Sequence, residues 1–495
     1  MRASTTGRVG WLVGAAATAL VVGAAGQVSW VRLPAVTATP APQTGPQPTG
    51  AGSASPGPRQ LLLFRRAGHL PVAAPAAALP YPQTVPSRRD VGLVDEAGVR
   101  VFRGADGRTY DHPVFQGQYG IQLLQTYLTT GDRWFLDRAL LQARRVRDTG
   151  VPDRGTRWLP YRFGFDLYGV PGDALAPPWH SGMAQGRALS LFARLALVTG
   201  DPTWRRSADD IFGSLTLGPT DDGPWATWVD GSGHLWLEEY PRTPPERSEQ
   251  VLNGHIAAAF GLYDYWRLTG DRDAAALFDG AATTVEHWLP RGFRAPGSAS
   301  RYSLRGRRPH EGYHAIHVQQ LLRLHALTGQ PTFARWADLL AQDFPTPQVT
   351  APVRFAPGRH QLYHLTADGV QPAGRTHIFD ATTATADRRR RSGDGVYYRI
   401  AKGPLTGRWA REITGRSTMT TVVAITTYSL PRRLTGAGPS AAYWIADGRA
   451  DLVGDPGRLA LVRATGWWDG RRFGQLAAGS LAGAWVRLSG PDALA

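Results

Sequence analysis

The sequence predicts a mainly α-helical protein: an incomplete (α/α) toroid of helix pairs, preceded by an N-terminal membrane-anchor helix and followed by a C-terminal all-β module. Three observations support this prediction. A Leu-Thr-Gly-Asp signature recurs between amphipathic segments, short Val, Ile and Tyr runs replace the helical pattern after residue 346, and an uncharged stretch occupies residues 9–31. We therefore divide the chain into residues 1–32, 33–60, 61–345 and 346–495.

Residues 1–32 have the composition of a membrane anchor. Arg8 precedes the uncharged stretch and Arg32 ends it. About 20 apolar residues span a bilayer as a helix, whereas the apolar core of a cleaved signal peptide is usually only ~7–15 residues long. We expect an uncleaved single-pass anchor, with a cleaved signal peptide as the alternative. Positive charge before the span predicts a body outside the cytoplasm, at the cell surface.

Residues 33–60 are mainly Pro, Ala, Gly, Thr and Ser. This composition cannot bury a core and is typical of a semi-extended tether. The formal net charge of the chain is +16, which raises the local concentration of anionic partners. The sequence has no nucleic-acid-binding motif, so an acidic polysaccharide is the better candidate. We expect the basic run Arg388–Arg391 to be a solvated loop.

The recurring signature predicts helix pairs in residues 61–345. Its four copies end in Gly131-Asp132, Gly200-Asp201, Gly270-Asp271 and Gly329-Gln330. Glycine is suited to the left-handed position that ends one helix, and aspartate caps the first turn of the next. A repeat at this spacing favours an (α/α) toroid. A plain helical solenoid is the alternative, although the segments between pairs are long and aromatic.

Residues 346–495 contain a second repeat. Ile400–Trp409 matches Leu476–Trp485 in its spacing of Gly, Leu, Gly and Trp. Together with the short β-branched runs, this duplication predicts an all-β module of two similar units. We expect a structural or binding appendage, and we expect the helical region to fold without it.

The stretch Leu235-Trp-Leu-Glu-Glu-Tyr-Pro241 is the strongest candidate for chemistry, and Val251-Leu-Asn-Gly254 follows it. Carboxylates can transfer protons, and aromatic rings can stack on sugars. Further blocks begin at Trp179, Tyr302 and Tyr313. Because loops at one end of a helical ring converge, these blocks can line one cleft. Core packing remains the alternative for Tyr240 and Trp236.

These blocks, in this order, resemble the C-terminal domain of the heparosan and heparan D-glucuronyl C5-epimerase family, over roughly residues 158–340. The resemblance implies a helical catalytic domain, a glucuronate substrate, and a catalytic set of one glutamate and several tyrosines. That set carries over to Glu239, Tyr240, Tyr302 and Tyr313. Members of the family have a β-rich part before the helical domain, whereas this sequence has one after it.

Inversion at C5 of a uronate needs one group that removes a proton and another that delivers one to the opposite face. A carboxylate and a phenol supply such a pair. Arg305 is expected to pair with the substrate carboxylate, and Asn253 to position the substrate or cap its helix. The full set of expected substrate-binding residues is Arg305, Asn253, Trp236, His314, His317, Trp179 and Gln185. No cofactor and no metal are expected, since a packed histidine pair is commoner than a metal site.

The sequence therefore predicts a membrane-anchored, extracytoplasmic C5-epimerase acting on glucuronic-acid residues of an acidic polysaccharide. A uronate lyase or a glycoside hydrolase on the same scaffold is one alternative, because a lyase begins with the same proton removal. A non-catalytic surface protein that binds an acidic glycan is the other. The expected partners are this polysaccharide and the membrane, without nucleic acid, and a homodimer is one option for the assembly.

Overall fold

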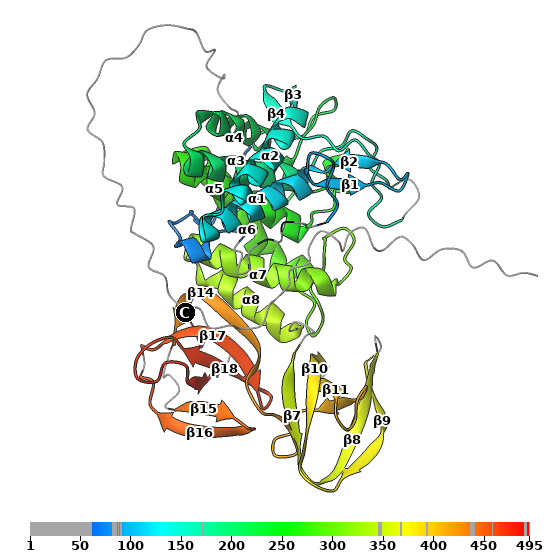
Figure 1. The fold of residues 1–495 in the computed structure, drawn as a ribbon, viewed down its shortest axis with the longest axis vertical. Helices are drawn as coiled ribbons and strands as arrows, with labels where there is room; N and C mark the ends of the chain where they lie inside the picture. Colours follow the sequence, from blue (N-terminus) through cyan, green and yellow to red (C-terminus); the bar gives the residue numbers. More distant parts are fainter. Residues whose placement is uncertain are drawn as a thin grey trace, which may run out of the picture. The chain divides into compact units, whose positions relative to one another are not determined.

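The computed structural model describes residues 62–81, 87, 89, 92–169, 173–344, 349–366, 369–392, 395–435, 441–457, 459–489 and 493–494 (Figure 1). A helical region is followed by two β-sheets, as predicted. The expected anchor and linker, residues 1–60, lie outside the described part of the chain. Within the part that is described, no helix has the length and apolar character needed to cross a membrane.

The helical region consists of four consecutive helix pairs. They are α1 (Pro113–Thr130) with α2 (Arg133–Thr149), α3 (Gly182–Thr199) with α4 (Pro202–Leu215), α5 (Leu252–Thr269) with α6 (Arg272–Trp288), and α7 (Glu311–Thr328) with α8 (Pro331–Asp343). The joint glycines at 131, 200, 270 and 329 all have φ between 68° and 70°. The left-handed C-cap predicted at every joint is therefore confirmed.

The aspartates of the joints cap the following helices. The side chains of Asp132, Asp201 and Asp271 accept hydrogen bonds from backbone N–H groups in the first turns of α2, α4 and α6. Gln330 makes no such side-chain bond, and α8 begins instead with Pro331, a residue that needs no N–H partner at this position.

The odd-numbered helices form the inner layer of the helical region. α1, α3, α5 and α7 contact one another in that order, and each contacts its outer partner. Nearly every residue of α5 from Leu252 to Tyr265 is buried, so this helix is not the amphipathic segment that its sequence suggested. α3 and α5 approach closely at Gly186, where an added Cβ would lie 2.3 Å from Cα of Ala258.

The segments between pairs contain short antiparallel hairpins. These are β1 (Val101–Arg103) with β2 (Thr109–Asp111), β3 (Val151–Asp153) with β4 (Thr156–Trp158), and β5 (Thr227–Val229) with β6 (Leu235–Leu237). Short helical turns occur at η2 (Ala76–Ala78), η3 (Pro245–Arg247) and η4 (Leu289–Phe293). Ahead of the helix pairs, the segment of residues 62–81 runs across helices α5, α6 and α7. At its end, Tyr81 donates a hydrogen bond to the backbone carbonyl of Ala257 in α5 at 2.8 Å.

The C-terminal part contains two antiparallel sheets. The first has the order β13-β7-β10-β11-β12-β8-β9, and the second has the order β14-β17-β18-β19-β15-β16. Their strands are β7 (Ala351–Phe355), β8 (Gly358–Thr366), β9 (Gly369–Ile378), β10 (Thr382–Ser392), β11 (Gly395–Lys402), β12 (Trp409–Arg411), β13 (Ser417–Met419), β14 (Val423–Arg433), β15 (Ala442–Ala446), β16 (Arg449–Gly454), β17 (Leu461–Trp468), β18 (Arg471–Leu476) and β19 (Trp485–Arg487). The run Arg388–Arg391, expected to be a loop, lies within β10.

The duplicated sequence motif is the same hairpin built once in each sheet. Ile400–Trp409 joins β11 to β12, and Leu476–Trp485 joins β18 to β19. The backbone bond from Gly407 N to the carbonyl of Ile400, at 2.8 Å, has its counterpart from Gly483 N to the carbonyl of Leu476, at 3.0 Å. Both glycines have positive φ. The repeat therefore encodes a tight turn that holds two neighbouring strands.

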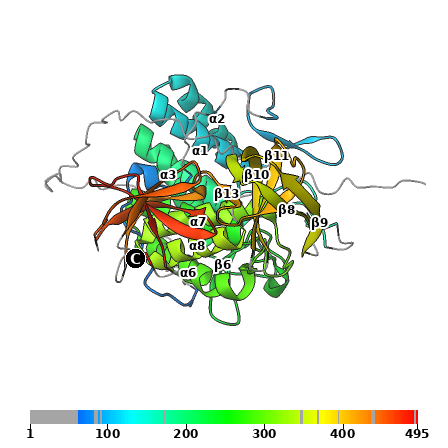
Figure 2. The same cartoon turned by 90° about the horizontal axis from the view of Figure 1, so that it is seen from below.

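The six-stranded sheet shares its core with the helical region. In Figure 2, the orange strands of this sheet lie over α7 and α8. Asp338 of α8 is buried and accepts ion pairs from Arg432 at 2.6 Å and Arg472 at 2.5 Å, and a hydrogen bond from Tyr428 at 2.6 Å. Since one hydrophobic cluster includes residues of both parts, the structure argues against independent folding of the helical region.

Candidate active site

Segments that are distant in the sequence meet at the N-terminal ends of the inner helices. The backbone N–H of Leu252, at the start of α5, donates to the carbonyl of Tyr302 at 3.2 Å. The N–H of Gly182, at the start of α3, donates to the carbonyl of Glu238 at 2.7 Å. The Gly-Asp joints lie at the opposite ends of these helices. The long aromatic connections, and not the repeated turns, therefore form the candidate site.

Glu238 stabilises the loop between β6 and α5, which contains Glu239. Its side chain is fully buried and accepts hydrogen bonds from the backbone N–H groups of Tyr240 at 3.2 Å and Gln250 at 3.0 Å. Burial raises the pKa of Glu238 to about 8, although the two backbone bonds oppose the rise. Its carboxyl group is thus engaged with the protein backbone and does not face a ligand.

Glu239 lies against the start of α5. A Cβ added to Gly254 would lie 2.0 Å from Oε2 of Glu239, so the glycine of the Val-Leu-Asn-Gly block makes room for this carboxyl group. Oε2 is buried and has no hydrogen-bond partner in the protein. Burial raises the pKa of Glu239 to about 7, against the opposing effects of a hydrogen bond from Tyr240 and the charge of Arg187.

Three tyrosines surround Glu239. The hydroxyl groups of Tyr240 and Tyr302 are 3.4 Å apart, and the ring centroids of Tyr302 and Tyr313 are 4.5 Å apart. The charge of Glu239 acts on all three phenols. The structure therefore brings together the four residues that the family resemblance implied as catalytic.

The three phenols are protonated at neutral pH. Burial, followed by the charge of Glu239, raises the pKa of Tyr240 and of Tyr302 well above its ordinary value. The same two causes raise the pKa of Tyr313 to about 12. The site thus combines a carboxyl group that ionises near neutrality with phenols that keep their protons. Such a pair of groups allows the carboxylate to act as a general base and a phenol to act as a general acid.

Sequence reasoning missed Arg187. This residue of α3 is 9% exposed, and its Nε and Nη1 atoms are buried without hydrogen-bond partners. Its guanidinium lies over the ring of Tyr81, 4.1 Å from the centroid, and its charge lowers the pKa of Glu239. Its place directly after the Trp-His-Ser-Gly-Met-Ala-Gln-Gly block was the one available signal, since a cation in so apolar a helix needs an explanation.

A stack of aromatic rings adjoins the tyrosines. The rings of Trp179 and Tyr161 are parallel, 3.9 Å apart with an interplanar angle of 6°. Phe165 stacks between Trp179 and Tyr240, with centroid distances of 5.7 Å and 5.5 Å. Trp179 was expected to contact the substrate, and it lies in the same hydrophobic cluster as Tyr240 and Tyr302. The stack forms an apolar wall beside the carboxyl group.

Two expected substrate contacts are structural residues instead. Trp236 is 1% exposed, and its ring N–H donates to Asp230 at 2.9 Å. Gln185 is completely buried and bonds to the backbone of Arg157 and Leu159. The inward-facing positions of a hairpin and of an inner helix both fill the core, so sequence pattern alone could not separate them from the site.

Arg305 is already paired within the protein. Its guanidinium makes two bonds of 3.1 Å to Asp173 and one of 2.7 Å to Glu249. Arg242 also pairs with Asp173, at 3.3 Å. The expectation that Arg305 pairs with a substrate carboxylate does not agree with this arrangement, because two protein carboxylates compete for its charge. These ion pairs connect the loop before α5 to the segment around Asp173.

The two histidines of α7 have different environments. His314 is saturated, because its ring nitrogens bond to Ser300 and to the carbonyl of Leu340, both at 3.0 Å, so it is a structural residue and not a substrate contact. His317 bonds through Nδ1 to Ser300 at 2.7 Å, while its buried Nε2 has no partner. Burial lowers the pKa of His317 to about 3, so it is neutral. Among the described residues, no three metal-ligating side chains form a group.

Asn253 keeps the position expected of a substrate contact. It is 5% exposed, lies in the first turn of α5 beside Gly254, and has a buried side-chain oxygen without a partner. Its backbone carbonyl accepts a bond from Gln320 of α7 at 2.8 Å, and the amide oxygen of Gln320 is likewise unpartnered. Buried polar atoms rarely remain unsatisfied. These atoms are therefore candidates for bonds to sugar hydroxyl groups or to water.

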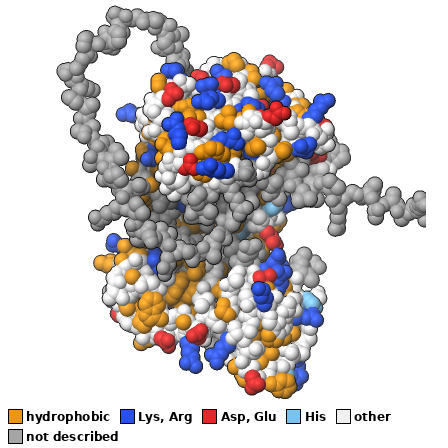
Figure 3. Space-filling view, in the orientation of Figure 1, with side chains coloured by type: hydrophobic (Ala, Val, Ile, Leu, Met, Phe, Trp, Pro, Cys, Tyr) orange, Lys and Arg blue, Asp and Glu red, His pale blue; other side chains and the backbone are white. Residues whose placement is uncertain are grey.

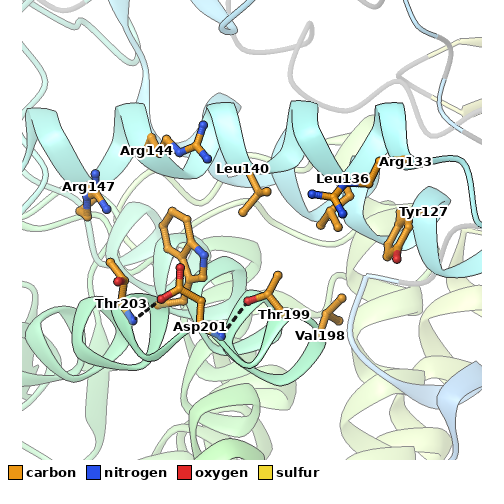
Figure 4. A pocket seen from close by; sticks show the side chains of 11 residues that line it. Tyr127, Arg133, Leu136, Leu140, Arg144, Arg147, Val198, Thr199, Asp201 and Thr203 are labelled. Atoms are coloured by element: carbon orange, nitrogen blue, oxygen red, sulfur yellow. Dashed lines mark hydrogen bonds between the residues drawn. The ribbon is translucent and has the colours of Figure 1, made fainter.

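A pocket of about 440 Å³ lies elsewhere, between α2 and the turn that joins α3 to α4 (Figure 4). Arg133, Arg144 and Arg147 of α2 line it, opposite Asp201. Asp201 is occupied in capping α4. This pocket lies at the joint end of α3, away from Glu239, and lacks a carboxylate facing a phenol.

Comparison with known proteins identifies part of the chain. Residues 153–341 match the family model described as the D-glucuronyl C5-epimerase C-terminus. The D-glucuronyl C5-epimerase of Caenorhabditis elegans is 28% identical over 183 residues, covering 33% of this chain and 28% of that protein. An uncharacterized protein of Methanocaldococcus jannaschii is 23% identical over 213 residues, covering 43% of this chain and 66% of that protein. The chain thus spans less than two thirds of either relative.

Solved structures show more distant similarity. Cellobiose 2-epimerase from Bacillus thermoamylovorans has a TM-score of 0.36 and 14% identity, over 48% of this chain and 61% of its own. A family 76 α-mannanase from Bacteroides thetaiotaomicron has a TM-score of 0.35 and 11% identity, over 49% and 59%. Scores this low add nothing to the interpretation of the site. The sequence match confirms the predicted resemblance: residues 153–341 are similar to the C-terminal region of the D-glucuronyl C5-epimerase family.

Proposed function

We propose that this protein is a C5-epimerase that acts on glucuronic-acid residues of an acidic polysaccharide. The observation that carries the proposal is the cluster of the partly buried Glu239 and Tyr313 with the buried Tyr240 and Tyr302. A carboxyl group with a pKa of about 7 lies among phenols that remain protonated. We further propose that the four helix pairs form an incomplete (α/α) toroid with this cluster at one end.

In the proposed reaction, Glu239 removes the C5 proton. The C5–H bond breaks, and its electron pair moves into the substrate carboxyl group to give an enediolate-like anion. Tyr313 then donates its hydroxyl proton to the opposite face of C5, after which Glu239 releases the abstracted proton to solvent and solvent returns a proton to the phenol. No oxidant or reductant is consumed, because the product is an isomer. A base with a pKa near the working pH is well matched to this first step.

Tyr240 and Tyr302 are proposed to stabilise the developing anion. Their hydroxyl groups lie 3.4 Å apart and keep their protons. Tyr302 can donate to the oxyanion directly, and Tyr240, which donates to the ionised Glu239, can do so once Glu239 has taken up the C5 proton. Donors already positioned in a site shielded from water are more effective than water, because they need no reorganisation during the reaction. Asn253 and Gln320 supply unpartnered acceptors for sugar hydroxyl groups.

The alternative functions are supported less well. A glycoside hydrolase uses two carboxyl groups, on either side of the scissile bond, whereas Glu238 is committed to the backbone of its own loop. A non-catalytic binding protein would have no need of a carboxylate with one buried oxygen left without a partner. A uronate lyase shares the first proton transfer and differs in the fate of the anion, so experiment must separate it from an epimerase.

The test is proton NMR of heparosan incubated with the full-length protein in D2O. We expect deuterium at C5 of the uronate and new signals from its C5 epimer. Absence of exchange from glucuronate-containing polymers would contradict the proposal. An unsaturated product that absorbs in the ultraviolet would identify a lyase.

We also propose that the enzyme is held outside the cytoplasm by residues 9–31. The charge-flanked apolar stretch and the Pro-rich tether support this. Protease treatment of intact cells should degrade the body, and alkaline extraction should leave the full-length chain in the membrane. A mature N-terminus near residue 27 would contradict the proposed membrane anchor but would still agree with export of the body from the cytoplasm.

A further inference from the structure

The seven-stranded sheet places like charges directly opposite one another. The strand register pairs Arg388 of β10 with Arg399 of β11, and Arg399 in turn with Trp409 of β12. Trp409 is opposite Tyr363 of β8. Residues that lie directly opposite on antiparallel strands share one face of the sheet. A row across four strands therefore presents two arginines followed by two aromatic rings.

A second row repeats the combination two residues along the strands. Arg390 lies opposite Tyr397, and Tyr397 lies opposite Arg411. The rings of Tyr397 and Tyr363 meet edge to face, with centroids 5.1 Å apart, and link the two rows. We call the outward side of β7 to β12 that carries both rows the basic–aromatic face.

The opposite side of the same strands is the core of this part of the protein. Tyr398 and Ile400 of β11 and Ala410 of β12 alternate with the residues of the two rows and belong to a buried hydrophobic cluster. Arg388 is exposed, and so are Arg354 of β7 and Arg375 of β9. The basic–aromatic face is thus the side of the sheet that carries the exposed arginines, although Tyr397 within it is only 6% exposed. Figure 3 shows Lys and Arg side chains on the lobe that this sheet forms.

The charges of this face are poorly balanced. Asp387, at an irregularity in β10, pairs with Arg399 at 2.8 Å. Arg and Lys outnumber Asp and Glu more than two to one between residues 351 and 419. Asp387 already balances Arg399, so the excess positive charge of this face lies on the exposed Arg354, Arg375 and Arg388, which would attract an anionic partner.

We propose that the basic–aromatic face binds a strand of acidic polysaccharide and keeps the polymer near the helical region. Arginines pair with carboxylates in a bidentate manner, while rings such as Trp409 can stack on sugars. Neighbouring positions across the sheet repeat about every 4.8 Å, which suits an extended polymer better than a single small anion. The choice of a uronate polymer over other polyanions rests on the proposed function.

The test compares two triple variants of the full-length protein with equal net charge. Arg354→Gln/Arg375→Gln/Arg388→Gln removes exposed charge from the face, and Arg206→Gln/Arg272→Gln/Arg335→Gln removes exposed charge from the outer helices. Affinity electrophoresis through gels that contain heparosan, or neutral dextran, measures binding. We expect the first variant to lose about tenfold or more in affinity for heparosan and the second to lose little. Equal losses would overturn the proposal.

A third variant tests stacking without a change of charge. Trp409→Ala should weaken heparosan binding several-fold, with thermal unfolding as the check that the sheet remains folded. Single-stranded DNA and phosphatidylglycerol vesicles, at matched charge, serve as competitors. If either competes as well as heparosan, the partner class is wrong.

Activity on a short glucuronate oligosaccharide separates this proposal from the catalytic one. The face variants should process the oligosaccharide at the wild-type rate and long heparosan more slowly at low concentration. If the face variants bind heparosan as the wild type does and remain active, only the proposal that the basic–aromatic face binds the polymer is overturned. If heparosan binding depends on the face but no exchange occurs at C5, only the proposed epimerase function is overturned.

Discussion

Oε2 of Glu239 occupies the space in which the side chain of residue 254 would lie, because a Cβ on Gly254 would come within 2.0 Å of it. The first turn of α5 therefore fixes where the carboxyl group can be. Gly254→Ala should displace Glu239 and reduce turnover by about 10²-fold, since shifts of ~1 Å in a catalytic group can cost this much. Gly231→Ala, where an added Cβ meets nothing within 4 Å, is the matched control. Unchanged turnover in Gly254→Ala would remove Glu239 from the mechanism.

Substitution of Glu239 or Tyr313 should reduce activity far more than substitution of the adjacent Glu238. Glu239→Gln and Tyr313→Phe should each lose about 10²–10⁴-fold in C5 exchange while remaining folded. Glu238→Gln should retain most activity at neutral pH, because a carboxyl group with a pKa of about 8 is already largely protonated there. Deuterium incorporation measured by NMR gives all three rates. Wild-type rates in Glu239→Gln and Tyr313→Phe would show that the assignment is wrong.

The rate should depend on pH through Glu239. If the ionised carboxylate is the base, kcat/KM should rise with pH and level off above about 7. The phenols that face Glu239, those of Tyr240, Tyr302 and Tyr313, stay neutral over this range. Arg187→Gln removes the charge that lowers the pKa of Glu239, so the rise should move to higher pH.

Arg187→Lys keeps the positive charge and should restore the wild-type midpoint in part. A merely structural role for Arg187 would lower the amplitude of the pH–rate profile and leave its midpoint in place. Measuring the midpoint in all three proteins therefore distinguishes the two roles.

The buried carboxyl of Glu238 should make stability depend on pH. Its pKa in the folded protein, about 8, is above the ordinary value near 4.5. The stability that it contributes is fully present below about pH 4.5 and is lost as pH rises toward 8, because the folded state holds the proton more tightly. Urea unfolding at pH 5 and pH 8 should show a fall of a few kcal/mol, on the order of 1.4 kcal/mol per pH unit. Glu238→Gln should remove the part due to Glu238 and leave the smaller fall due to Glu239, whose pKa is raised to about 7.

Asp338 should be essential for joining the helices to the six-stranded sheet. Asp338→Ala leaves the buried Arg432 and the partly buried Arg472 without their shared carboxylate, and loss of one partner of a buried pair costs about 3–5 kcal/mol. Asp137→Ala removes the exposed i,i+4 pair with Arg133 and should cost only about 0.3–0.5 kcal/mol. Chemical denaturation compares the two variants. A chain ending near residue 345 should likewise be unstable, and cooperative unfolding of that fragment would contradict the shared core.

Features that depend on local geometry could be predicted from the order of residues. The joints at Gly131, Gly200, Gly270 and Gly329 could be predicted because a left-handed turn followed by a capped helix needs only neighbouring residues. The duplicated hairpin after Ile400 and the order of the family motifs were accessible for the same reason. Glu239 and the three tyrosines were found through those motifs.

Which polar and aromatic side chains face the site depends on packing between distant segments. Glu238 and Glu239 are chemically identical, and only the packing of β6 against α5 directs one to the backbone and the other to the phenols. Trp236 and Gln185 turned to the core because their elements are buried on all sides. Arg305 pairs with carboxylates more than fifty residues away, whereas Arg187 lies over the ring of Tyr81 with two nitrogens that have no hydrogen-bond partner. Side-chain direction depends on neighbours that are distant in the chain, and a pattern of residue types does not encode them.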